Sequence, residues 1–98
     1  MVNINTPVRV GRIAKRVVYQ LSNRTSLVIS NMSDTATLYY GGDNSVSINN
    51  GIPIRPSTTV SFLQGIGDRP DLERWLISDA ENTDVRIGEE VEKEREIE

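Results

Sequence analysis

Short runs of alternating apolar and polar residues, each closed by turn-forming residues, restrict the fold of this chain more than any other feature. Between Arg16 and Ile87 apolar residues recur at every second position, as in Leu27 and Ile29. Successive side chains of a β-strand point to opposite faces of a sheet, so this period of two predicts strands. The other groups that share a face are Val17, Tyr19 and Leu21; Leu38 and Tyr40; Val46 and Ile48; Val60 and Phe62; Trp75 and Ile77; and Val85 and Ile87.

Turn-forming residues separate these runs at short intervals. Asn50-Gly51 is the pair best suited to a type I′ hairpin turn, because Asn and Gly tolerate the positive φ that this turn needs. Pro53 cannot donate to a strand ladder, which indicates a sheet edge or a crossing between two sheets. The pattern predicts an all-β protein, a small antiparallel β-sandwich or barrel over residues 16–88.

Composition limits the chemistry of the chain. A length of 98 residues fits one domain. With neither cysteine nor histidine, the chain has no disulfide, no thiolate metal site and no imidazole base. We therefore expect no catalytic residue, no cofactor and no metal ion, and we do not expect an enzyme. No apolar stretch is long enough for a signal-peptide core or a membrane span, so we expect a soluble protein without a membrane partner.

The two ends of the chain carry opposite charge. Residues 1–33 have five Lys or Arg and no Asp or Glu, and residues 34–98 have six Lys or Arg against 14 Asp or Glu. Opposite charges attract, either inside one molecule or between the N-terminal segment of one copy and the acidic flank of the next.

The segments outside residues 16–88 are predicted to be an arm and a tail. Residues 1–15 contain Pro7 and Gly11 and indicate an extended arm, which could add as a strand to a sheet edge of its own subunit or of a neighbour. On this prediction, removal of residues 1–15 leaves the sandwich folded. Gly88 can end the last strand, and residues 89–98 are predicted to form a charged tail, solvated or as a short helix.

A metal site and a nucleic-acid site have weaker support. Asp68, Asp71 and Glu73 lie around a glycine-containing loop and could supply carboxylate oxygens to a calcium ion, but their spacing does not match the calcium loop of an EF-hand. A pI near 4.9, with one Trp, three Tyr and one Phe, weighs against nucleic acid as a partner. The aromatic residues of the strands are expected to pack in the core. These are Tyr19, Tyr40 and Trp75.

Several segments of the chain occur in an order that is also found in a known group of proteins. They are NRTSLVISN (23–31), LYYG (38–41), SVS (45–47), NGIPI (50–54) with Pro56, and DVRIGE (84–89). In this order the chain resembles small β-sandwich structural proteins of tailed bacteriophages and related viruses, over roughly residues 20–90. The resemblance implies a virion component: a head decoration or cement protein, a head fibre, or a tail or connector accessory protein. The basic arm and the acidic tail depart from the pattern, so it does not fix the location within the virion.

We therefore expect a non-enzymatic virion structural protein, a capsid decoration or cement protein made in the host cytoplasm. Its expected partners are the major capsid protein or other virion proteins and further copies of itself in a homo-oligomer. The residues expected to bind these partners are Val8, Arg9, Val10, Arg12, Ile13, Lys15 and Arg16. The alternative is a phage tail or fibre module that recognises a glycan or host surface through its loops. The loop candidates are Tyr39, Asp43, Asn44, Asp68 and Arg69.

Overall fold

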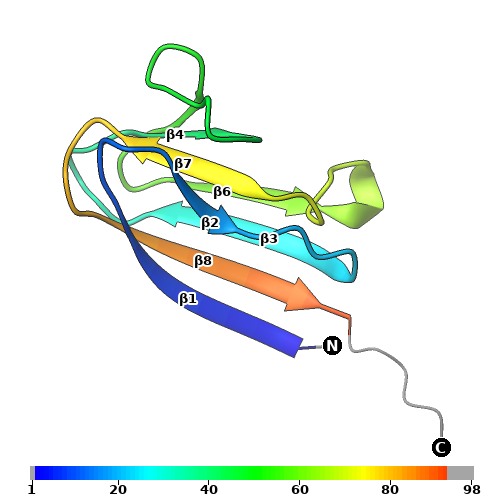
Figure 1. Ribbon diagram of the computed structural model, residues 1–98. Helices are drawn as coiled ribbons and strands as arrows, with labels where there is room; N and C mark the ends of the chain where they lie inside the picture. Colours follow the sequence, from blue (N-terminus) through cyan, green and yellow to red (C-terminus); the bar gives the residue numbers. More distant parts are fainter. Residues whose placement is uncertain (1, 93–98) are drawn as a thin grey trace, which may run out of the picture.

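The computed structural model describes residues 2–92 and has two four-stranded antiparallel sheets packed against each other (Figure 1). Sheet A has the strand order β1-β8-β3-β6, and sheet B has the order β2-β7-β4-β5. The strands are β1 (Val2–Val10), β2 (Lys15–Val18), β3 (Arg24–Asn31), β4 (Leu38–Gly41), β5 (Ile52–Ile54), β6 (Thr59–Leu63), β7 (Arg74–Ser78) and β8 (Thr83–Val91), with a 3₁₀ turn, η1 (Gln64–Ile66), after β6. The predicted all-β sandwich is confirmed.

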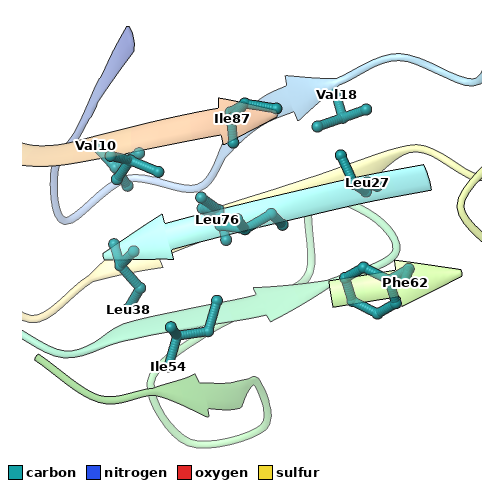
Figure 2. Close-up of a cluster of buried hydrophobic side chains, with 10 residues drawn as sticks. Val10, Val18, Leu27, Leu38, Ile54, Phe62, Leu76 and Ile87 are labelled. Atoms are coloured by element: carbon teal, nitrogen blue, oxygen red, sulfur yellow. The ribbon is translucent and has the colours of Figure 1, made fainter. Parts of the chain in front are cut away.

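The hydrophobic core lies between the inner faces of the two sheets (Figure 2). Leu27 and Ile29 of β3 face it together with Val85 and Ile87 of β8, as their alternation predicts. The other buried members are Val10, Val18, Leu38, Ile54, Phe62 and Leu76. Each fully buried side chain of this kind contributes about 1.5–3 kcal/mol, so this layer is the main source of stability.

In β2 and the segment after it, the predicted face is buried only at its start, where Val17 packs against the core. Val18 is buried, whereas Tyr19 is 64% exposed and Leu21 is also exposed. The strand ends at Val18, and its register with β7 shifts between Arg16 and Val18. A slip of one residue exchanges the two faces of a strand, which is why the prediction for Tyr19 and Leu21 was wrong.

The N-terminal segment is part of sheet A. β1 pairs antiparallel with β8 along its whole length, from Val2 opposite Val91 to Val10 opposite Thr83. The sequence left open whether this segment adds to a sheet of its own subunit or of a neighbour. In the structure it is the edge strand of its own sheet A. Pro7 fits there because an edge strand has one side without ladder partners.

The last strand runs three residues past Gly88. Gly88 lies opposite Asn5 of β1 and Val28 of β3, and Glu89 to Val91 continue both ladders. The boundaries predicted at residues 15 and 88 therefore do not separate an arm and a tail from the sandwich, since residues 2–10 and 89–91 are strands. Residues 93–98 of the predicted tail lie outside the described residues.

Arg24 is a charged residue inside the fold, only 2% exposed at the start of β3. Its Nε donates to Glu89 Oε1 of β8 at 2.7 Å, and its two Nη atoms donate to the carbonyls of Pro70 (3.1 Å) and Tyr19 (2.8 Å). A buried guanidinium is tolerated when its donors are satisfied in this way. Arg24 thereby ties β3 and β8 to the segment after β2 and to the loop before β7.

Asn31 makes the corresponding connection at the other end of β3. Its buried Nδ2 donates to the carbonyls of Ala36 (2.9 Å), Ile54 (3.0 Å) and Arg55 (3.2 Å), and its Oδ1 accepts from the Ser33 amide. One side chain of sheet A thus forms hydrogen bonds with backbone groups at the end of β5 in sheet B and in the loop after β3.

Residues 42–51 form a loop rather than the strand predicted around Val46 and Ile48, and Figure 1 shows this loop, in green, rising above sheet B. Val46 is buried, but Asn50 and Gly51 do not take the positive φ of a type I′ turn. Gly51 is needed for another reason. A Cβ atom there would lie 2.6 Å from Cβ of Tyr39, so only glycine lets the loop approach β4.

Gly51→Ala is expected to destabilise the protein by about 1–3 kcal/mol, because the new methyl group overpacks the contact with Tyr39. Gly65→Ala is the matched control: nothing lies within 4 Å of its ideal Cβ and its φ is not positive, so stability stays equal or rises by about 0.4–1 kcal/mol. Urea unfolding of both variants measures the difference, and equal midpoints would contradict the close approach.

Candidate interaction surface

The outer face of sheet B carries apolar and aromatic side chains where an exposed sheet face is usually polar. Within β7, Trp75 and Ile77 alternate with buried Arg74, Leu76 and Ser78, so they point away from the core. Cross-strand neighbours continue the face on both sides. Arg16 of β2 lies opposite Trp75, while Tyr39 of β4 lies opposite both Ile77 and Pro53.

At the β2 edge of this face, three side chains surround that of Arg16. The guanidinium carbon of Arg16 lies 4.0 Å from the ring centroid of Tyr19 and 5.9 Å from that of Trp75. Glu73 fixes the group, because its Oε2 accepts from Trp75 Nε1 at 2.8 Å and its Oε1 lies 3.9 Å from Arg16 Nη1. We call Arg16, Tyr19, Glu73 and Trp75 the aromatic cluster. Its rotamers are held before any partner arrives.

Core packing was therefore the wrong prediction for Trp75 and Tyr19, and it is right for Tyr40, which packs edge-on against Phe62 at 5.5 Å between ring centroids. Arg74 takes the inner position that Trp75 was expected to fill. Its guanidinium lies 4.5 Å from the Phe62 ring and donates to the Arg69 carbonyl. Burial lowers the pKa of Arg74.

The residues predicted to bind a partner divide into two groups. Val10 is fully buried in the core and Val8 packs against it, so these two are not available to a partner. The other five lie at the surface, on β1, on the connection to β2 and on β2 itself: Arg9, Arg12, Ile13, Lys15 and Arg16. The structure brings only Arg16 into the aromatic cluster.

The basic residues of this region already have acceptors within the chain. Arg9 donates to the Asn82 carbonyl at 3.4 Å, Arg12 Nε to the Asp79 carbonyl at 3.3 Å, and Lys15 to the Arg9 carbonyl at 3.2 Å. These acceptors are uncharged backbone carbonyls. Ion pairs between the basic and the acidic part of the chain are formed by Arg16 with Glu73 at the surface and by Arg24 with Glu89 in the interior.

Two acidic residues near η1 form their interactions with residues close to them in the sequence. Asp68 accepts from the Leu63 amide at 3.1 Å, and Asp71 forms an ion pair with Arg69 at 3.0 Å that lowers the pKa of Asp71. Across residues 2–92, no three or more Asp and Glu side chains come together in an arrangement that could hold a metal ion.

Four of the five candidate loop residues of the alternative function lie in two separate loops, and the fifth lies on a strand. Asp43 accepts from both the hydroxyl and the amide of Ser45, which lowers its pKa. A polar hollow of about 300 Å³ follows β4, lined by Gly41, Gly42, Asp43, Ser45, Val46 and Asn50. In the loop after η1, Asp68 accepts from the amide of Leu63 in β6 and Arg69 donates to Asp71, while Tyr39 lies on β4.

Comparison of the chain with family models, with curated proteins and with solved structures gave no match. In the part of the chain that the structure describes, no helix is long and apolar enough to cross a membrane.

Proposed function

We propose that this protein is a non-enzymatic virion structural protein, a decoration or cement protein that binds the viral shell and neighbouring copies. The observation that carries the proposal is the aromatic cluster on the outer face of sheet B. Trp, Tyr and Arg are the residue types that dominate the energetics of protein interfaces. Here Arg16, Tyr19 and Trp75 occur together outside the core, and Glu73 contacts both Arg16 and Trp75.

The virion assignment is supported by the resemblance of residues 20–90 to phage β-sandwich proteins. The docking surface proposed here differs from the predicted one, because Val8 and Val10 of β1 pack in the core. It consists of the aromatic cluster together with Tyr39, which lies on the same face of sheet B. Many copies on a repetitive shell add their contacts, so each single contact can be weak.

Trp75→Ala is expected to weaken binding to shell particles by about 30-fold or more, the effect of losing an interface residue worth about 2 kcal/mol. Leu63→Ala is the matched control, since Leu63 is a half-exposed apolar residue on sheet A. Co-sedimentation of purified protein with particles stripped of it measures the binding. Equal binding by both variants, with both folded, would contradict this surface.

A second candidate function is recognition of a glycan or host surface by the loop after β4. The polar hollow with Asp43, Ser45 and Asn50 favours it, because sugar hydroxyls need such acceptors and donors. Binding on a glycan array that Asp43→Ala abolishes and Trp75→Ala leaves unchanged would support this function over shell docking.

A further inference from the structure

The connection between β1 and β2, residues 11–14, presents an isoleucine to solvent. Ile13 is 83% exposed, the highest value among the large apolar side chains of residues 2–92. The backbone before it is fixed, because Ser78 N donates to the Gly11 carbonyl at 2.9 Å and Arg12 N donates to Glu81 Oε1 at 3.1 Å. Folding of a single chain gives no reason for an isoleucine at this held, exposed position.

An apolar hollow lies beside this connection, on the outer face of sheet B. Its volume is about 380 Å³, and it is lined by Arg12, Ser47, Ile48, Ile77, Ser78 and Asp79. Ile48 comes from the loop 42–51 and Ile77 from β7. The hollow is large enough to accept an aliphatic side chain, since pockets for small ligands begin at about 300 Å³.

The rim of the hollow carries one charge of each sign. Arg12 uses Nε for the backbone carbonyl of Asp79, and the Asp79 carboxylate accepts from the Thr37 amide at 3.0 Å. Among the described residues, no ion pair joins these two side chains. Because both side chains line the hollow, a twofold axis placed at this rim would bring Arg12 of each copy to Asp79 of the other, and the rim would be complementary in charge to itself.

We propose that two copies of this chain pair about such an axis, each seating its Ile13 in the Ile48–Ile77 hollow of the other, with Arg12 facing Asp79 across the contact. The inference rests on the proposed function, because it specifies how neighbouring copies meet. Its test uses the purified protein alone, without particles. A failed pairing test therefore leaves shell binding to be judged by the Trp75 experiment.

A charge exchange tests the pairing directly. In a dimer of the Arg12→Glu variant, the new glutamate would face Asp79 of the other copy at both contacts. In a dimer of the Asp79→Arg variant, the new arginine would face Arg12 of the other copy at both contacts. Like charges repel, so each variant alone is expected to be monomeric. An equimolar mixture restores an opposite-charge contact at both positions. Sedimentation equilibrium is expected to give dimers for the wild type, monomers for each variant and dimers for the mixture. A mixture of folded variants that stays monomeric would overturn the proposal.

Apolar substitutions provide a second test that leaves the charged rim intact. Ile13→Ser is expected to raise the dimer dissociation constant about tenfold or more, because each copy loses the burial of one isoleucine. Ile66→Ser is the matched control, as Ile66 is 73% exposed in η1 and outside the contact. Wild-type protein that stays monomeric at its highest soluble concentration, or equal dissociation constants for the two serine variants, would overturn the proposal.

Discussion

Removal of residues 1–10 is expected to unfold the protein. The deletion takes away β1, the partner of β8 along nine residue pairs, together with the fully buried side chain of Val10. It also leaves one side of β8 without ladder partners. A chain of this size has a stability of about 5–15 kcal/mol, and the loss of a whole strand with its core contacts removes most of it. Circular dichroism and thermal unfolding of the truncated chain measure the outcome.

The control for this truncation keeps the strand and changes only exposed side chains. Val2 and Ile4 are 44% and 39% exposed, so the double substitution Val2→Thr and Ile4→Thr is expected to change stability little. A truncated protein that melts cooperatively near the wild-type temperature would mean that β1 is a dispensable arm after all.

Replacing Arg24 by methionine is expected to cost about 3–5 kcal/mol, because it leaves Glu89 without its partner in a largely buried position. It also removes the donors to the carbonyls of Pro70 and Tyr19. For a domain of this length, each kcal/mol lowers the melting temperature by roughly 4–8 °C. Differential scanning calorimetry therefore resolves the effect clearly.

Arg86→Met is the matched control for Arg24. Arg86 pairs with Asp84 at 3.5 Å with about half of its side chain exposed, and exposed ion pairs contribute about 0–1 kcal/mol. Adding Glu89→Met to Arg24→Met is expected to recover part of the loss, since no buried charge then remains unpaired. Equal melting temperatures for Arg24→Met and Arg86→Met would contradict the account of the buried pair.

The sequence predicted the strands whose two faces differ clearly. In β8, Val85 and Ile87 alternate with Asp84, Arg86 and Gly88, and in β3 Leu27 and Ile29 lie between Ser26 and Ser30, so the period of two identified both the strands and their buried side.

Alternation could not identify the buried face where both faces contain large residues. In β7, Trp75 and Ile77 alternate with Arg74 and Leu76, and tertiary contacts of Arg74 decide which side is inside. The shift in register near Val18 has no sequence signal of its own. The aromatic cluster was missed for these two reasons.

Long-range pairing was the other limit. β1 lies against β8, with Val2 opposite Val91, and a local pattern cannot specify a partner at the opposite end of the chain. The opposite charges of the two ends indicated their attraction but left open whether it acts within one copy or between copies. Trp75, which we propose as a docking residue, was likewise not among the predicted docking residues, because only the N-terminal segment was expected to be free to bind.

Quantitative mass spectrometry of purified virus particles, produced from the genome that encodes this chain, tests whether the protein is a virion component. The proposed function predicts that the protein co-purifies with the particles at a fixed ratio to the major shell protein, and that Trp75→Ala lowers this ratio while Leu63→Ala does not. Particles that contain none of the protein, with all of it in the unassembled fraction, would contradict the claim.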